Sequence, residues 1–191
     1  MDPDLPLIET MQAGDDSALN ELIHRHREPL FRFVYRYLRD EIAAADVVQE
    51  TFVRAYFKAK QFRPRATVKT WLYTIALNLS RDQARRLSKR VGEVSLDVPS
   101  ANGGLRPEFY DEQPTPGTIV GQQDQFARLQ RAIDQLPQTL REALVLFSLD
   151  GNSQRETADI LGTSPKTIEL RVYHAKAKLR ALLGSRFRPT D

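Results

Sequence analysis

The stretch SQRETADILGTSPKTIELRVYHAKAKLRALL, residues 153–183, predicts two helices joined by a short turn. Ser153 followed by Glu156 forms a capping box that opens the first helix. Gly162 stands where that helix needs a left-handed terminal residue, and Ser164 caps the helix that follows. Two helices joined by so short a turn are typical of a helix-turn-helix, whose second helix enters the major groove of DNA.

The second helix of this pair has distinct buried and outward faces. An apolar stripe at 3.6-residue spacing predicts the buried side: Ile168, Val172, Ala175, Leu179 and Leu182. An ordinary helical hairpin with a solvated basic face is the alternative. The short turn, the small Ala158 where two helices approach and the long basic second helix together favour a DNA reader. The outward face and its flanks supply the candidate DNA-contacting residues: Lys166, Thr167, Glu169, Leu170, Arg171 and His174.

Length and composition limit the remaining classes. A chain of 191 residues has room for one medium domain or two small ones. It has no cysteine, which excludes disulfide scaffolds and thiolate metal sites. No apolar run reaches the roughly 20 residues of a membrane span, and the first ten residues are acidic rather than signal-like. We therefore expect a cytoplasmic protein with no membrane contact of its own.

The net charge of +3 is unevenly distributed along the chain. Residues 61–90 carry 8 basic and 1 acidic groups, and residues 126–191 carry 11 and 7, so these blocks have charges of +7 and +4. Residues 91–125, with 1 basic and 6 acidic groups, have a charge of −5. Two basic blocks on either side of an acidic segment predict two separate contacts with a polyanion.

The first 60 residues predict a lead-in and two helices. Residues 1–13 contain two prolines and few packing signals, so we expect a loose segment. A helix is predicted over 17–39, kinked or divided at Pro29. The next helix, 40–60, has its predicted core stripe at Ile42, Ala45, Val48, Phe52, Ala55, Tyr56 and Ala59.

The outer face of helix 40–60 predicts a partner surface. Glu50 and Arg54 are spaced as a surface ion pair, and a solvated face would explain these two residues. It would not explain Val47 and Phe57, which the same spacing leaves exposed. Large apolar groups on a polar face are typical of protein–protein contacts, where a few anchors carry much of the binding energy.

Residues 61–87 predict a contact with single-stranded nucleic acid. QFRPRAT at 61–67 indicates a basic loop, and a helix follows over 68–87. An aromatic ring can stack on a base, an amide can read its edge and guanidinium groups neutralise phosphates. A core position for Trp71 with merely solubilising arginines is the alternative. The strip that carries these groups consists of Trp71, Thr74, Asn78, Arg81 and Arg85.

The rest of the chain completes an all-α prediction with two small helical domains. Prolines and glycines interrupt every periodic pattern between the two basic blocks, which indicates a linker. Helices are expected at 126–136 and 139–149, before the helix-turn-helix. We therefore predict an N-terminal domain over 1–92, an acidic linker over 93–125 and a C-terminal domain over 126–191.

At these residues the chain resembles the extracytoplasmic-function sigma factors, small initiation factors of the sigma-70 family that keep conserved regions 2 and 4. DVVQETFVRAY at 46–56 is similar to the family's polymerase-binding helix. TWLYTIALNLSRDQARR at 70–86 is similar to its minus-10 helix, and the segment from residue 136 to 183 is similar to its minus-35 domain. The three motifs stand in the family's order, and the span from residue 46 to residue 183 that contains them covers about three quarters of the chain.

The resemblance assigns roles residue by residue. It implies that Arg155 and the candidates of the second helix contact the minus-35 duplex. It also implies that Trp71, Asn78 and the loop with Arg63, Arg65 and Lys69 hold the melted minus-10 strand. It implies that core RNA polymerase is bound by Asp46, Gln49, Glu50, Phe52 and Arg54. Phe52 also lies on the predicted core stripe. The resemblance further implies control by an anti-sigma factor, and no enzymatic activity, cofactor or metal.

A stand-alone helix-turn-helix regulator is the alternative function. It would bind duplex DNA and have no affinity for core polymerase, and it needs neither the Trp71 strip nor an apolar patch on helix 40–60. An enzyme finds little support, because no glycine-rich phosphate loop or nucleophile arrangement is present. His24 and His26 are two residues apart and point to different helix faces, which does not favour a metal site.

Overall fold

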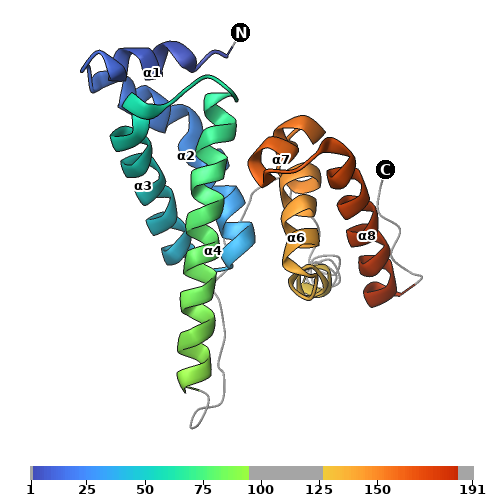
Figure 1. The fold of residues 1–191 in the computed structure, drawn as a ribbon. Helices are drawn as coiled ribbons and strands as arrows, with labels where there is room; N and C mark the ends of the chain where they lie inside the picture. Colours follow the sequence, from blue (N-terminus) through green and yellow to red (C-terminus); the bar gives the residue numbers. More distant parts are fainter. Residues whose placement is uncertain (1, 95–126, 185–191) are drawn as a thin grey trace, which may run out of the picture.

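The computed structural model describes residues 2–94 and 127–184, and these are helical with no strand among them. They form two groups of helices that lie side by side (Figure 1). The predicted linker, 93–125, lies almost entirely outside the described residues. No helix in the described part of the chain is long and apolar enough to cross a membrane. The N-terminal group consists of α1 (Leu5–Gln12), α2 (Ser17–Leu38), α3 (Glu41–Lys58), the 3-10 turn η1 (Ala59–Gln61) and α4 (Val68–Val94).

The loose segment predicted for residues 1–13 is wrong. Residues 5–12 form α1, with a proline in its first turn, where the missing N–H costs nothing. Ile8 and Met11 are buried in the core of the N-terminal group. The sequence pattern concealed this, because a helix this short shows only one turn of apolar spacing.

Of the two predicted effects of Pro29, a kink or a division, the division is wrong: α2 runs without a break from Ser17 to Leu38. A proline inside a helix removes one backbone hydrogen bond. Here the helix buries Leu22, Leu30 and Phe33 completely against its neighbours. That burial, roughly 2 kcal/mol for each large apolar side chain, offsets the loss.

α4 extends further than predicted, to Val94 rather than residue 87. Thr67 caps its start, since its hydroxyl accepts a hydrogen bond from the backbone N–H of Thr70 at 3.2 Å. Val68, Leu72 and Ala76 are buried along one face of α4. α4 stands beside α2 and α3 and extends beyond them at its carboxyl end (Figure 1).

The C-terminal group contains a helical stretch at 127–134 and then α6 (Gln138–Leu144), α7 (Gln154–Leu161) and α8 (Pro165–Leu183). The helix predicted over 139–149 changes halfway into a π-helix, η2 (Val145–Leu149). Asp150 N–H closes it by donating to the Val145 carbonyl at 2.9 Å. The wider turn directs Val145 and Leu146 into the core of the N-terminal group.

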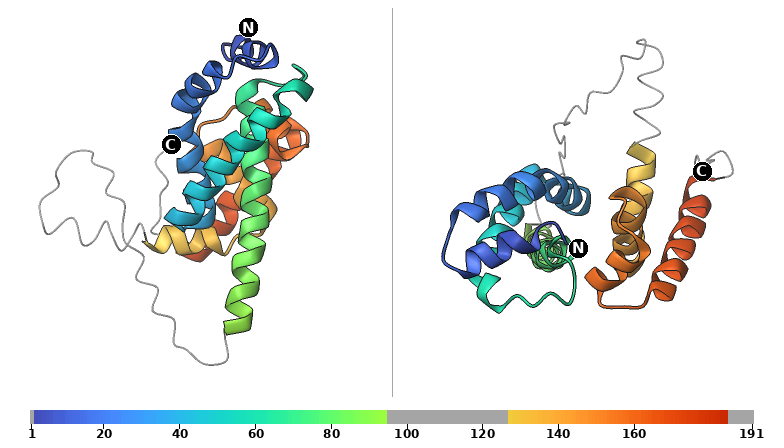
Figure 2. Two further views of the ribbon diagram at one scale, coloured as in Figure 1. Left: turned by 90° about the vertical axis from the view of Figure 1, so that its left-hand side faces the viewer. Right: turned by 90° about the horizontal axis from the view of Figure 1, so that it is seen from above.

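The two groups of helices therefore pack directly against each other. Val145, Leu146 and Ile160 of the C-terminal group belong to the same apolar core cluster as the buried side chains of α2, α3 and α4. The contact is made by η2 and α7 against α2 and α4, whereas α8 lies on the far side of the C-terminal group (Figures 1 and 2).

Candidate nucleic-acid and partner interfaces

The outer face of α3 presents four of its seven predicted partner-binding residues without restriction. Asp46, Gln49, Arg54 and Phe57 are exposed, and Phe57 has 72% of its surface accessible. Glu50 is half-buried and accepts a hydrogen bond from Arg54 Nε at 2.7 Å, so the predicted ion pair forms. The result is a polar face with one large aromatic side chain at its end.

Val47 does not belong to this face, and its predicted exposure is wrong. It is 6% exposed and packs in the core, whereas Ile42, predicted to be buried, is 78% exposed. The cause is that α3 packs against both α2 and α4, so its buried arc is wider and rotated relative to the predicted stripe. Phe52 is also buried, at 5% exposure, and its edge reaches the surface only as part of a groove.

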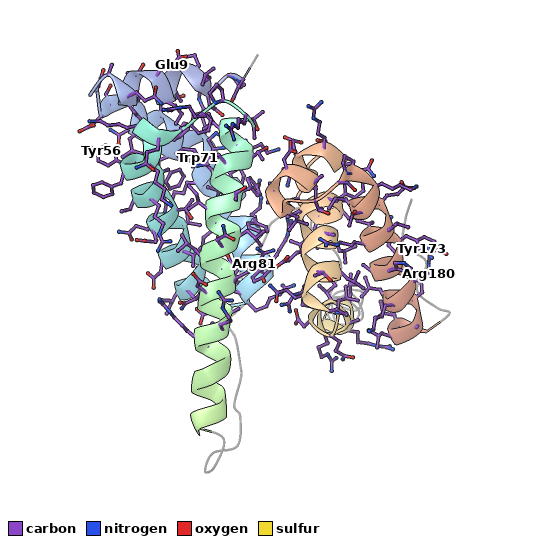
Figure 3. The ribbon with its side chains drawn as sticks, viewed as in Figure 1. Glu9, Tyr56, Trp71, Arg81, Tyr173 and Arg180 are labelled. Atoms are coloured by element: carbon purple, nitrogen blue, oxygen red, sulfur yellow. The ribbon has the colours of Figure 1, made fainter. Side chains whose placement is uncertain are left out.

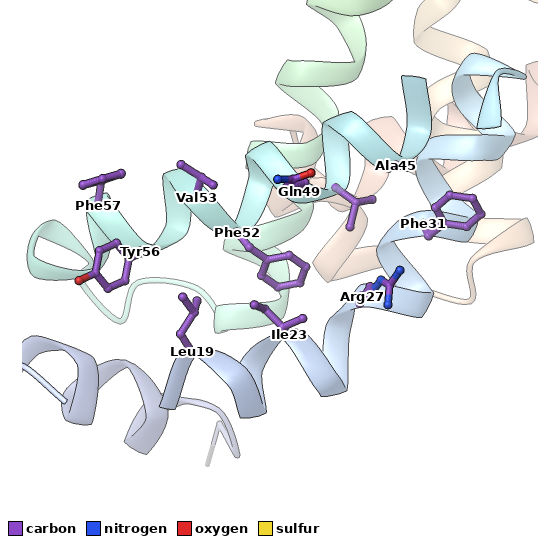
Figure 4. A pocket seen from close by; sticks show the side chains of 11 residues that line it. Leu19, Ile23, Arg27, Phe31, Ala45, Gln49, Phe52, Val53, Tyr56 and Phe57 are labelled. Atoms are coloured by element: carbon purple, nitrogen blue, oxygen red, sulfur yellow. The ribbon is translucent and has the colours of Figure 1, made fainter. Parts of the chain in front are cut away.

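A mainly apolar groove of about 520 Å³ lies between α2 and α3, next to this face. Figure 4 shows Leu19 and Ile23 on α2 opposite Phe52 on α3. The sequence analysis assigned no residue of α2 to this surface, although α2 supplies one wall of the groove. The side chains that line the groove are Leu19, Ile23, Arg27, Phe31, Ala45, Val48, Gln49, Phe52, Val53, Tyr56 and Phe57.

The basic loop before α4 is anchored by an aromatic pair. Phe62, at the start of the loop, packs on the Trp71 ring with the ring centroids 4.9 Å apart. Trp71 is half-buried and packs against the core, so the core position considered from the sequence is partly correct, while part of the side chain remains accessible. Arg63 and Arg65 between them are exposed. The loop thus holds two guanidinium groups beside an indole.

The predicted strip along α4 is only partly accessible. Asn78 and Arg85 are exposed, and Thr74 turns its hydroxyl inward to donate to the Thr70 carbonyl at 2.8 Å. Arg81 makes a two-pronged ion pair with Glu142 of α6, with Nε to Oε1 at 2.8 Å and Nη2 to Oε2 at 2.7 Å. Figure 3 shows Arg81 extending from α4 toward the C-terminal group.

Lys69, from the start of α4, also forms an ion pair with the C-terminal group. Its Nζ lies 3.2 Å from Glu156 Oε1 of α7. Glu156 is also the capping-box residue that accepts from Ser153 N–H, so one carboxylate serves both the helix cap and the domain contact. Two candidate DNA-binding cations of the N-terminal group are therefore occupied by carboxylates of the C-terminal group.

The Glu142 carboxylate is the centre of this domain contact. It is 1% exposed and also accepts hydrogen bonds from Tyr37 Oη at 3.0 Å and Gln138 Nε2 at 2.8 Å. Burial opposes its ionisation, but the hydrogen bonds from Arg81 and Gln138 outweigh burial and lower the pKa of Glu142. Burial, together with this nearby carboxylate, raises the pKa of Tyr37 to about 12.

A second ion pair lies at the end of η2. Arg36 of α2 donates to the Leu149 carbonyl at 2.9 Å and pairs with Asp150, whose side chain is 3% exposed. Burial raises the pKa of Asp150 to about 6, against the opposing effect of Arg36. Sequence reasoning assigned no role to Asp150 or Glu142. Glu142 nevertheless gives a signal in the sequence, because it stands directly before the mainly apolar run 143–149. A charge that such a run buries requires a partner.

The helix-turn-helix forms as predicted. Ser153 and Glu156 make both hydrogen bonds of the capping box, and Gly162 adopts the left-handed conformation with φ 61° and ψ 42°. Ser164 accepts from Thr167 N–H at the start of α8. These caps fix where α8 begins and hence which side chains its first turns present.

The candidate side chains of this unit are largely accessible. Leu170 is 49% exposed, Arg171 is half-buried and the Thr167 hydroxyl lies 2.9 Å from the Ser164 hydroxyl within the cap. Leu182 of the predicted buried stripe is 42% exposed, because the last turn of α8 extends past its neighbours. Tyr173, 65% exposed beside His174, adds an aromatic group to the outward face (Figure 3). The remaining candidates, Arg155, Lys166, Glu169 and His174, are exposed.

Comparison with known proteins agrees with this arrangement. Residues 22–90 match the family model for sigma-70 region 2, and residues 126–179 match the model for sigma-70 region 4. The first match spans α2 to α4, and the second spans the helix-turn-helix. The two models thus fall on the two groups of helices.

Two relatives place the chain more closely. The RNA polymerase sigma factor CnrH of Cupriavidus metallidurans is 33% identical over 187 residues, which cover 96% of this chain and 96% of CnrH. The ECF RNA polymerase sigma factor SigE of Mycolicibacterium smegmatis is 32% identical, over 90% of this chain and 65% of SigE. The chain therefore spans about two thirds of the length of SigE.

Solved structures share the fold. CnrH in complex with the cytosolic domain of CnrY superposes with a TM-score of 0.70 at 29% identity, covering 96% of this chain and 99% of CnrH. The sigma factor RpoE of Bartonella quintana, solved with the anti-sigma factor NepR, gives a TM-score of 0.66 at 24% identity, covering 88% and 98%. With both region models matched and CnrH aligned over nearly its whole length, the chain belongs to the extracytoplasmic-function sigma factors of the sigma-70 family.

Proposed function

We propose that this chain is a promoter-specificity subunit, which binds core RNA polymerase and directs initiation without catalysing a reaction itself. The observation that carries this function is the presence, in one folded chain, of a helix-turn-helix and a separate basic and aromatic strip on α4. A stand-alone regulator requires only the first. Family membership favours the same function.

In this function α8 and the start of α7 read the minus-35 duplex. Arg155 and Lys166 carry positive charge for phosphates, and Leu170 offers an apolar contact for a thymine methyl group. Arg171 supplies a donor for a base edge. Because α8 lies away from the domain contact, this reading requires no rearrangement of the two groups of helices.

The loop 62–67 and the α4 strip hold the melted minus-10 strand. The accessible part of the Trp71 side chain stacks on an unpaired base, Asn78 reads the edge of a base, and Arg63, Arg65 and Arg85 neutralise phosphates. Capture of an extruded base returns the few kcal/mol that unpairing costs. Lys69 and Arg81 join this surface only after their ion pairs with Glu156 and Glu142 break.

The outer face of α3 binds core polymerase through Asp46, Gln49, Glu50, Arg54 and Phe57. The adjacent α2–α3 groove, lined by Phe31, Phe52 and Tyr56, can accept an apolar helix from a second protein. CnrH, which has this fold, has been solved with the cytosolic domain of CnrY bound. We include an anti-sigma partner of this chain in the proposal, with a contact that overlaps the polymerase surface.

The test is titration of core RNA polymerase with the labelled chain by fluorescence anisotropy, with and without a promoter fragment. We expect tight binding to core and promoter opening only in the combined complex. The double variant Glu50→Ala, Arg54→Ala should weaken core binding tenfold or more and leave duplex binding unchanged, since anchors of this kind carry at least 1.4 kcal/mol. Arg171→Ala should do the reverse.

The matched control is Glu28→Ala with Arg32→Ala. That pair has the same i,i+4 spacing on α2, with Arg32 Nη1 3.4 Å from Glu28 Oε1, and it lies outside the proposed surface. Binding to duplex DNA without any affinity for core polymerase would support the stand-alone regulator instead. Equal loss of both activities in both folded variants would contradict the assignment of two sites.

A further inference from the structure

We infer that Asp2 is a positioning residue for the minus-10 strand, because its carboxylate fixes the end of the basic loop 62–67. Asp2 Oδ2 accepts a hydrogen bond from the backbone N–H of Val68 at 2.7 Å, across 66 residues of sequence. This inference rests on the proposed function of the loop. Neither the motifs nor the apolar spacing of the sequence pointed to Asp2.

The hydrogen bond completes the amino-terminal cap of α4. The first N–H groups of a helix lack partners within the helix, and its amino end favours a negative charge. Thr67 Oγ1 accepts from Thr70 N–H, which leaves the N–H of Val68 for the Asp2 carboxylate. The last residue of the loop and the first residue of the helix are thus held by two separate side chains.

The other end of the loop is held by α1. Gln12, the last residue of α1, donates from Nε2 to the carbonyl of Ala59 at 2.8 Å. Ala59 begins the 3-10 turn that leads into Phe62. α1 and the residues just before it therefore bind both ends of the segment that carries Arg63 and Arg65.

α1 can transmit this constraint because it is itself fixed to the core. Asp4, 5% exposed, lies 2.7 Å from His26 Nε2 and 3.0 Å from Arg25 Nη1 of α2. Ile8 and Met11 fill the core beneath α1. A rigid helix thus spans the ends of a loop whose own backbone makes few hydrogen bonds, and this is how a loop is held ready for its ligand.

The positioning function of Asp2 and the negative charge of its carboxylate should have opposite effects on DNA binding. A carboxylate near a nucleic-acid surface repels phosphates, so its removal should strengthen DNA binding if charge were its only contribution. A positioning function predicts the reverse, since loss of the cap releases the loop. The two interpretations therefore differ in sign.

The experiment compares holoenzymes carrying Asp2→Ala, Asp2→Asn or Glu9→Ala for opening of a promoter with a fluorescent base analogue in the minus-10 element. Glu9→Ala is the matched control, since Glu9 is an exposed carboxylate on α1 (Figure 3). We expect Asp2→Ala to slow opening roughly fivefold, as loss of a helix cap would. Asp2→Asn keeps an acceptor for the Val68 N–H and should restore most of the rate, and Glu9→Ala should not slow opening.

A second readout needs no polymerase. Trp71 is the only tryptophan of the chain and packs on Phe62 of the loop, so its fluorescence reports the loop in the free protein. Quenching of Trp71 by acrylamide should increase in Asp2→Ala and stay near the wild-type value in Asp2→Asn. Binding to core and to the minus-35 duplex should be unchanged in both.

Three results would overturn the inference. They are wild-type opening and quenching by Asp2→Ala, faster opening by Asp2→Ala, or a parallel loss of core binding and opening that shows general destabilisation. A wild-type chain that neither binds core nor opens promoters would instead overturn the proposed function. In that case the quenching comparison still decides whether Asp2 holds the loop.

Discussion

α4 and α8 both carry candidate DNA-binding residues, but the structure presents them differently. On α8 the charged candidates Lys166 and Glu169 are exposed, although they pair with each other at 2.9 Å. On α4, Arg81 is occupied by a carboxylate of the opposite domain, and so is Lys69 at its start. Under the proposed function, the α8 surface is accessible to a DNA duplex in this arrangement, whereas full single-strand binding by α4 would require the domains to separate.

α4 differs from α8 because carboxylates of the C-terminal group occupy its cations, where phosphates would otherwise bind. Glu142 meets Arg81 with two parallel hydrogen bonds, the geometry by which a guanidinium also binds phosphate. Glu156 offers Lys69 a single oxygen. In the proposed function a DNA strand would compete with the C-terminal domain for the same cations, and the predictions below test this competition from the largest expected effect to the smallest.

Glu142→Ala should have the largest effect, because it removes the acceptor of Arg81 and Tyr37 at once. Loss of one partner of a buried pair costs about 3 kcal/mol, which here falls on the closed arrangement. We expect the free chain to bind a minus-10 single strand at least tenfold more tightly, because less free energy is spent on opening. Asp159→Ala, which removes an exposed carboxylate of α7, is the control for charge alone and should change affinity by less than twofold.

The free energy of unfolding should depend on pH through the Asp150 carboxylate. Its pKa is raised from 3.8 to about 6 in the folded chain, so between these values the folded state binds a proton that the unfolded state does not. Asp150 therefore adds stability as the pH falls from 7 to 5, by about 1 kcal/mol, and this gain is lost as the pH rises through 6. Urea unfolding at pH 5 and pH 7 should show the gain in the wild type and not in Asp150→Asn. An equal change in both proteins would assign it to other groups.

Arg81→Ala and Arg85→Ala should differ in the free chain. Arg85 is exposed and, among the residues that the structure describes, pairs only with Asp82 of its own helix, so Arg85→Ala should remove a phosphate contact. Single-strand affinity should fall a fewfold, and the slope of log K against log salt should become shallower by about 0.7. Arg81→Ala also frees the C-terminal domain, so its net loss should be smaller. Equal losses in the free chain would indicate that the domain contact does not compete with DNA.

The sequence predicted the elements whose signals are local. The capping box, Gly162 and the α8 stripe as far as Leu179 depend on neighbouring residues, and their geometry is confirmed. The face of α3 was predicted less well, because the positions of Val47 and Ile42 depend on which two helices flank α3. Glu142 and Asp2 act on residues 61 and 66 positions away, and no periodic pattern encodes such pairs.

The most direct measurement is to lock the closed arrangement reversibly. The chain has no cysteine, so Arg36→Cys and Asp150→Cys can be joined specifically by a bismaleimide with a cleavable disulfide. These residues pair across the domain contact, and neither is a candidate DNA-binding residue. We predict that the linked protein binds a minus-10 single strand at least tenfold more weakly than the cleaved protein, while binding the minus-35 duplex equally well. Equal single-strand affinity before and after cleavage would contradict the account.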